Sequence, residues 1–162
     1  MQVKFIQSVY EAKRHLKIAQ YLLEVTMKIM DDKRVLAKCL VELQKAATYI
    51  IDSTLYLKLN TKEMPSGKDE RAKLFFEKIG KKTLEKTEVE ELKKVLLFAK
   101  KHKEARLEFV KGEKLVIFGR ENCRILTEKG VSESIRVLDT VLEWFEQKTQ
   151  DINTPLTLKK FD

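Results

Sequence analysis

Residues 5–57 decide the fold, and they read FIQSVYEAKRHLKIAQYLLEVTMKIMDDKRVLAKCLVELQKAATYIIDSTLYL. Two apolar stripes run through this stretch, and their spacing of alternating fours and threes places each stripe on one face of a helix. The first stripe is Phe5, Val9, Ala12, Leu16, Ala19, Leu23, Thr26 and Met30, and the second is Leu36, Leu40, Leu43, Ala47, Ile50, Thr54 and Leu57. Only residues 31–34 separate them, so the spacing predicts two long helices that fold back as an antiparallel hairpin.

The composition bounds the class of protein. The chain has 162 residues, of which 43% are hydrophobic and 36% charged, and glycine and proline together number only seven. This balance disfavours both a disordered chain and a turn-rich β-sandwich. A chain of this length can form one core without disulfides or metals. We therefore predict one helical-bundle domain over residues 1–153 and a C-terminal tail over residues 154–162.

Helical signals continue after the hairpin. Pro65-Ser66-Gly67 predicts a connection, and a short helix is expected at about residues 68–82. Residues 87–90 have the T-x-x-E form of a capping box, so we expect the next helix to begin at Thr87. The positions expected to face the core in these two helices are Ala72, Phe75, Phe76, Ile79, Val89, Leu92, Leu96 and Ala99.

The pattern then changes to short β-favouring runs. Runs at 109–110, 115–118 and 123–126 predict a small β-meander or hairpin at about 108–127, which packs its apolar side onto the helices. A last helix is expected from an N-cap at Ser132 to about Asn153, because Pro155 disfavours helical angles just before it. Its apolar stripe is Val131, Ile135, Leu138, Leu142 and Phe145. The predicted fold class is all-α, an up-and-down bundle of about five helices with the β-hairpin inserted before the last helix.

Cysteine usage and apolar run lengths bear on the compartment. Cys39 and Cys123 lie on a predicted helix and a predicted strand, without the spacing of a zinc site. We expect both to be reduced, buried residues of a cytoplasmic protein. Lys or Glu interrupts every apolar run before it reaches the roughly 18 residues that cross a bilayer, so no membrane association is expected.

No catalytic or cofactor motif stands out in the sequence. The five glycines are scattered, so neither phosphate-binding loop pattern occurs. His15 and His102 lie on separate predicted elements and have no second metal ligand at helical spacing. The sequence has no Glu-x-x-His signature of di-iron bundles and no serine in a nucleophile elbow. We therefore predict no metal, no cofactor, no catalytic residue and a function other than that of an enzyme.

The best functional candidate is a basic segment over residues 93–124. The formal net charge is +8, and residues 93–129 carry 11 basic and 5 acidic side chains. Cations at a helix end and on an adjacent hairpin could follow a phosphate backbone. The alternative is a solvated face in which the cations stabilise a helix dipole and glutamates balance them. The candidate nucleic-acid-binding residues are Lys100, Lys101, His102, Lys103, Arg106, Lys111, Lys114, Arg120 and Arg124.

Aromatic residues among the cations would strengthen the case for nucleic acid, because bases stack on exposed rings. Phe109 and Phe118 are available in the predicted strands, but an aromatic residue in an alternating strand usually lies in a core. We therefore expect both rings to be buried. The four tyrosines of the helical hairpin lie beside its apolar stripes and could line an interface with another subunit or a partner helix.

Two stretches resemble a group of small uncharacterised archaeal helical proteins. The first runs from Tyr21 to Thr26 and on to residues 32–36, at the tip of the hairpin, and the second joins residues 102–103, 108–110 and 114–117. This resemblance implies kinship and no activity. In architecture the chain also resembles the HEPN superfamily, whose active members cleave RNA with an Arg and a His a few residues apart on one helix. Here Arg14 directly precedes His15, and the motif is missing.

These observations predict a non-enzymatic interaction or scaffolding module. We expect it to self-associate through the long helical hairpin or to bind a protein partner. The first alternative is an RNA- or DNA-binding protein that uses the basic segment. The second is a degenerate HEPN-like nuclease, which would need His15 or His102.

Overall fold

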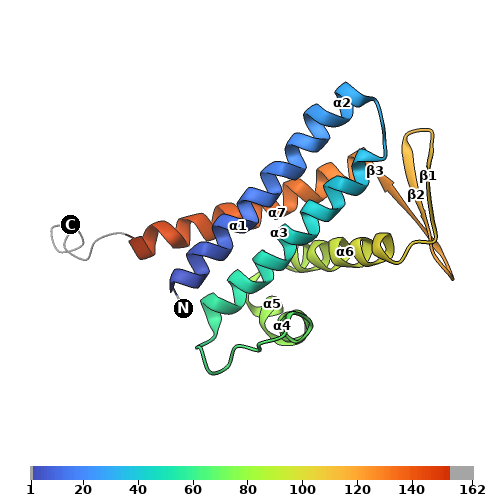
Figure 1. Cartoon of the computed structure of the whole chain (residues 1–162). Coiled ribbons are helices and arrows are strands. Elements are labelled where there is room, and N and C mark those ends of the chain that lie inside the picture. Colours follow the sequence, from blue (N-terminus) through green and yellow to red (C-terminus); the bar gives the residue numbers. More distant parts are fainter. Residues whose placement is uncertain (1, 154–162) are drawn as a thin grey trace.

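The long helical hairpin forms as predicted. In a computed structural model that describes residues 2–153, helix α1 (Gln2–Tyr21) continues through a π-helical turn, η1 (Leu22–Thr26), into α2 (Met27–Met30). Helix α3 (Val35–Lys58) returns antiparallel along α1, as Figure 1 shows. The predicted tail at residues 154–162 lies outside the described residues.

The π-helical turn corrects the end of the first apolar stripe. The stripe positions from Phe5 to Leu23 are buried as expected. Beyond them Thr26 is half-buried and Met30 is exposed, whereas Met27 is buried. A π-helical turn holds one more residue than an α-helical turn. The extra residue moves the inward position from Thr26 to Met27, so the stripe stays against α3.

The turn between the two helices is fixed by local contacts. Asp31 takes the left-handed conformation with φ of 49° and ends α2. The Asp32 carboxylate accepts the backbone N–H of Arg34 at 2.9 Å and its guanidinium at 2.8 Å. This side chain therefore closes the turn directly before α3 begins.

Helix α3 is the central element of the core. Its predicted stripe is buried as far as Thr54, and Leu57 is half-buried. Cys39, Ala46 and Ile51, which lie off that stripe, are buried as well. The reason is that α3 contacts helices on more than one side, namely α1, α4, α6 and α7. A helix with several packed neighbours buries more than one stripe.

The short helix expected at about residues 68–82 is built from three pieces. These are α4 (Lys68–Leu74), a second π-helical turn η2 (Phe75–Ile79) and α5 (Gly80–Thr83). Gly80 is buried inside this unit, where an added Cβ would lie 2.8 Å from Cζ of Phe75. The glycine therefore makes room for a ring that is fully buried in the core.

Helix α6 (Lys86–Lys103) begins earlier than the sequence indicates. Its capping box pairs Glu85 with Glu88, so the predicted box at Thr87 and Glu90 is wrong. The Glu88 carboxylate accepts the backbone N–H of Glu85 at 3.0 Å. A glutamate at the cap position performs the role that the T-x-x-E pattern assigns to threonine.

A three-stranded antiparallel meander precedes the last helix, so the chain is mostly helical but not strictly all-α. Strands β1 (Leu107–Lys111), β2 (Lys114–Phe118) and β3 (Cys123–Thr127) pair in the order β1-β2-β3. Helix α7 (Glu128–Asn153) follows β3 without a loop, so the predicted N-cap at Ser132 is wrong. The predicted end near Asn153 coincides with the last described residue and stays a prediction. The expected apolar stripe of this helix is buried. Figure 1 shows α7 crossing the hairpin, with the sheet at one end of the molecule.

Candidate nucleic-acid interface

The sheet has one face toward the helices and one face away from them. Leu115 and Ile117 of β2 are each 1% exposed, and Leu126 of β3 is 6% exposed, so this inner face joins the core. Side chains alternate along a strand, and the residues between these positions therefore point to the opposite, outer face.

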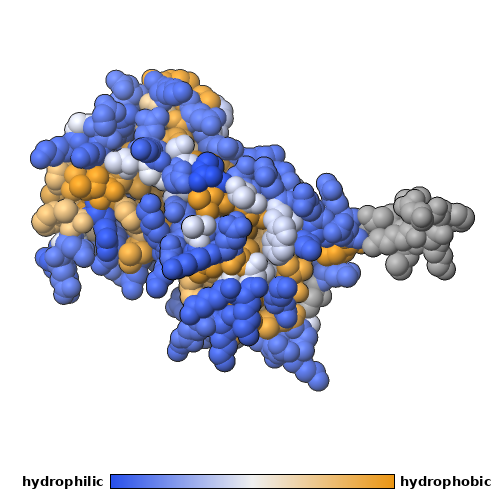
Figure 2. All heavy atoms as spheres, turned by 180° about the vertical axis from the view of Figure 1, so that it is seen from behind, coloured by the Kyte–Doolittle hydropathy of each residue, from blue (hydrophilic) through white to orange (hydrophobic). Residues whose placement is uncertain are grey.

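The outer face carries two apolar rows across the three strands. The strand register places Leu107, Phe118 and Cys123 opposite one another in the first row. The second row is Phe109, Val116 and Ile125. Most of these side chains are exposed, with Leu107 at 57%, Phe118 at 50%, Ile125 at 47% and Phe109 at 40%, whereas Val116 in the middle of the second row is only 9% exposed. Figure 2 shows the apolar atoms that gather at the sheet end of the molecule.

The expectation that Phe109 and Phe118 are buried is wrong. Phe109 is 40% exposed and Phe118 is 50% exposed. The alternation identifies two faces of each strand, but it does not say which face meets the helices. In this sheet the aliphatic residues Leu115 and Ile117 take the inner face, and both aromatic rings face outward.

Most of the predicted cations surround this outer face or lie on the helix that leads to it. Lys111 and Lys114 pair across β1 and β2 and form the next step of the outer face beyond Phe109. Arg106 directly precedes β1, and Arg120 lies in the turn between β2 and β3; both are exposed. The remaining lysines of the set lie in the last turn of α6, and they are Lys100, Lys101 and Lys103.

Two glutamates of the basic segment are committed to partners within the fold. Glu108 Oε1 lies 2.5 Å from Nδ1 of His102, and Glu113 lies 2.8 Å from Nζ of Lys33 at the hairpin tip. The hydrogen bond to Glu113 raises the pKa of the Lys33 ammonium. The carboxylates therefore hold the sheet to α6 and to the hairpin, and they do not pair with the cations of the outer face.

Arg124 stands apart from the other predicted cations. The register places it on the inner face of the sheet, in the row of Glu108 and Ile117. Its Nε atom is buried and makes no hydrogen bond to any residue between 2 and 153. The sequence placed Arg124 in the same set as Arg120, but the strand directs the two side chains differently.

Both histidines are held by glutamates. His15 is 8% exposed, its Nδ1 lies 2.6 Å from Oε2 of Glu42, and its ring stacks on Tyr49 at a centroid distance of 5.8 Å. His102 pairs with Glu108 as described above. A carboxylate at Nδ1 orients an imidazole for proton transfer in many active sites. The degenerate-nuclease alternative therefore stays a prediction for both histidines.

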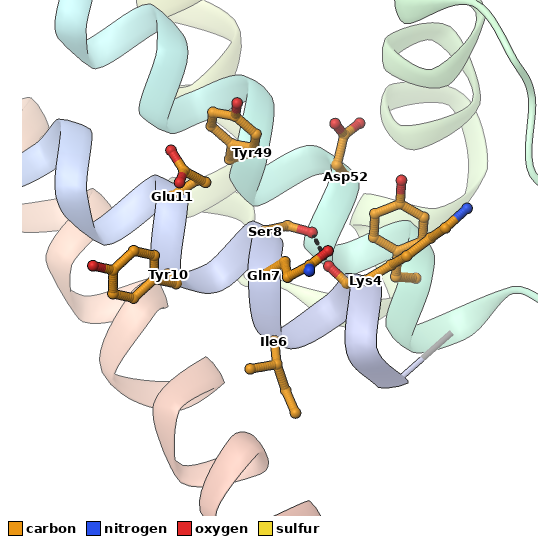
Figure 3. A pocket seen from close by; sticks show the side chains of 9 residues that line it. Lys4, Ile6, Gln7, Ser8, Tyr10, Glu11, Tyr49 and Asp52 are labelled. Atoms are coloured by element: carbon orange, nitrogen blue, oxygen red, sulfur yellow. Dashed lines mark hydrogen bonds between the residues drawn. The ribbon is translucent and has the colours of Figure 1, made fainter.

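A groove with a volume of about 700 Å³ lies between α1 and α3 (Figure 3). Three of its polar side chains are paired within the protein. Ser8 donates to the carbonyl of Lys4 at 2.5 Å, Glu11 pairs with Arg14 at 2.9 Å, and Asp52 pairs with Arg71 at 2.9 Å. The side chains of Lys4 and Gln7 and the hydroxyls of Tyr10, Tyr49 and Tyr56 also line the groove and form no hydrogen bond or ion pair with any residue between 2 and 153.

The described residues contain no cluster of three or more His, Cys, Asp or Glu side chains that could bind a metal ion.

Cys39 is buried as predicted, and burial raises the pKa of its thiol to about 12. Cys123 is exposed on the outer face of the sheet, so the expectation that it is buried is wrong. None of the helices within residues 2–153 is long and apolar enough to cross a membrane.

Comparison with known proteins identifies no relative. The sequence matches no family model, and neither a curated protein nor a solved structure matches the chain. The functional argument therefore depends on the residues of this chain alone.

Proposed function

We propose that this protein is an interaction module that binds nucleic acid at the sheet end of the molecule. One observation carries the proposal. Seven cations in this region form no ion pair with any residue in the described range 2–153, and they are Lys100, Lys101, Lys103, Arg106, Lys111, Lys114 and Arg120. We call them the sheet-end cations.

Unpaired cations favour a polyanion for an energetic reason. When Lys111 or Lys114 contacts a phosphate, it displaces only counterions condensed on the nucleic acid, and no internal ion pair has to break. The glutamates that could compete are fewer than the sequence suggests, because Glu108 and Glu113 are engaged with His102 and Lys33. The solvated-face alternative relied on such a balance of charge.

Salt dependence of affinity tests this proposal. Fluorescence anisotropy with mixed-sequence RNA and DNA oligonucleotides should show binding at about 50 mM salt that weakens steeply toward about 200 mM. The double variant Lys111→Ala/Lys114→Ala should lower the slope of log K against log salt by about 0.7 for each lost phosphate contact on a single strand. Absence of binding at the lowest salt would refute the proposal.

A matched control is available on α5. Lys81 and Lys82 are also exposed lysines without an ion pair among the described residues, but they lie on α5, away from the sheet (Figure 1). The variant Lys81→Ala/Lys82→Ala should leave the salt slope unchanged. An equal loss in both double variants would show a diffuse charge effect instead of a surface at the sheet end.

A second candidate is self-association through the helical hairpin. It is favoured by large apolar side chains that the hairpin leaves exposed, among them Tyr10 at 67%, Tyr21 at 60% and Ile29 at 78%. A second copy could cover these residues. Sedimentation velocity across a wide range of protein concentrations tests this candidate, and a monomer at every concentration would exclude it.

A further inference from the structure

We infer that the ligand is a single strand and that its bases stack on Phe109 and Phe118 on the outer face of the sheet. This inference rests on the proposed function and assigns a ligand class to the same surface. The two rings are 40% and 50% exposed, although phenylalanine is usually among the most buried residue types. Both rings are therefore accessible to a ligand, whereas Val116, which lies between Phe109 and Ile125, is buried.

The spacing of the rings selects unstacked bases. Phe109 lies opposite Val116, and Phe118 is two residues further along β2, so the rings occupy diagonal positions on neighbouring strands. Diagonal positions in an antiparallel pair are about 7–8 Å apart. Consecutive bases in a duplex are separated by only about 3.4 Å, and each base face is covered by its neighbour. Two bases can therefore reach both rings only from a strand whose bases are splayed apart.

Charge surrounds the apolar rows in a way that suits such a strand. Lys111 and Lys114 border the row of Phe109 at one end of the strands, and Arg106 and Arg120 border the row of Phe118 at the other end. A strand that crosses both rows therefore meets cations before the first ring and after the second. Stacking fixes the bases while these cations contact the phosphates.

A second copy of the chain fits this face less well. The outer face spans three strands of five residues, which is about 14 Å by 17 Å and amounts to a few hundred Å². A stable protein interface buries about 800 Å² on each partner. A two-fold contact would also bring the cations around one sheet toward those around the other, at a cost in electrostatic repulsion.

Anisotropy with a single strand of about 12 nucleotides, and with the corresponding duplex, tests the inference. The variants Phe109→Ala and Phe118→Ala should each reduce affinity for the single strand by about tenfold. Their salt slope should match that of the unmodified protein, because no cation is removed. Phe109→Tyr and Phe118→Tyr should keep the affinity, since tyrosine also offers a ring face.

The control variant is Tyr10→Ala/Tyr21→Ala, which removes two exposed rings from the hairpin instead of the sheet. It should bind the single strand as tightly as the unmodified protein. If the alanine variants at Phe109 and Phe118 keep full affinity, the stacking inference is overturned while nucleic-acid binding stands. If the unmodified protein binds neither single strand nor duplex, the proposed function itself fails.

Cys123 gives an independent readout of the same surface. It pairs with Phe118 across β2 and β3 and is exposed, whereas Cys39 is fully buried. Alkylation of Cys123 should slow when the single strand is added, and Cys39 should stay unreactive as a sign that the fold is intact. Protection of Cys123 that depends on protein concentration and needs no oligonucleotide would identify a second copy as the occupant and overturn the inference.

Discussion

The ion pair between Arg71 and Asp52 offers a sharp test of how this fold is held together. Arg71 of α4 donates from Nε to Oδ1 of Asp52 on α3 at 2.9 Å, and from Nη1 to the carbonyl of Ser66 at 2.8 Å. The exposed fractions of the two side chains are 21% and 13%. The pair therefore joins the loop before α4 to the central helix in a largely desolvated position.

Arg71→Met should be strongly destabilising near neutral pH, because it leaves the Asp52 carboxylate without its partner. Removal of one member of a buried ion pair costs roughly 3–5 kcal/mol. Because both side chains keep some contact with water, we expect a loss of about 3 kcal/mol in the free energy of unfolding at pH 7. A protonated Asp52 needs no cation, so at low pH the loss should fall to about 1 kcal/mol, the contribution of hydrogen bonds.

The direction of the pH dependence follows from the pKa of Asp52. Burial raises this pKa above its ordinary value of 3.8, and the Arg71 guanidinium opposes that rise. Without Arg71 the pKa rises further. A carboxyl whose pKa is higher in the folded than in the unfolded state stabilises the fold fully at pH values below its unfolded-state pKa. This stabilisation is lost as the pH rises through the folded-state pKa.

A double-mutant cycle with Asp52→Asn isolates this effect. Urea unfolding followed by circular dichroism at about pH 7 and about pH 4 gives the stability of the four proteins. In the Asp52→Asn background Arg71→Met should cost about 1 kcal/mol at both pH values. An equal cost of Arg71→Met in both backgrounds at pH 7 would refute the reasoning, because the carboxylate charge would then have no part in the penalty.

Two further predictions follow from the core and from the histidines. Gly80→Ala should lower the free energy of unfolding, because the new Cβ would lie 2.8 Å from the Phe75 ring; overpacking costs about 1–3 kcal/mol, which exceeds the gain in helix propensity of up to 1 kcal/mol. Urea unfolding of the variant checks this, and a rise in stability would contradict it. Incubation with labelled RNA should give no cleavage, because the Arg-His motif is missing. Cleavage that disappears in His102→Ala or His15→Ala would instead establish the nuclease alternative.

The hairpin could be predicted from the sequence because its signal is local and repeated. Stripes spaced by fours and threes over two helices leave one arrangement that buries them both. The stripe shifts at Thr26 and Met30 because of the π-helical turn at residues 22–26, and the second stripe is only half-buried at its end, Leu57. That turn packs against α3, and no residue type within it distinguishes it in the sequence from an ordinary α-helical turn.

The capping errors have a similar cause. The predicted caps at Thr87 and Ser132 use residue types that are good N-caps. The structure instead caps α6 with Glu85 and begins α7 directly after β3. The start of α6 is therefore still set by a local capping box, in which glutamate replaces threonine, whereas α7 begins where β3 ends.

The candidate site was only half visible in the sequence. Its cations were found because charge is a property of each residue, but Leu107, Val116, Ile125 and Cys123 of the outer face were missed. The alternation of side chains along β1 could have revealed this face, since Leu107, Phe109 and Lys111 alternate with Glu108 and Val110. The two faces of a short strand look alike until the helices that cover one of them are placed.

The exposed aromatic rings favour a ligand-binding surface over a charged face that only keeps the protein in solution. Cations alone keep a protein soluble, and apolar residues scattered singly on a surface need no explanation. At the sheet end the two occur together, because Phe109 and Phe118 share a face with Lys111 and Lys114. A surface selected only for solubility has no need of two exposed phenylalanines between its charges. A strand of nucleotides matches both features, because its charged backbone can contact the lysines and its flat bases can stack on the rings.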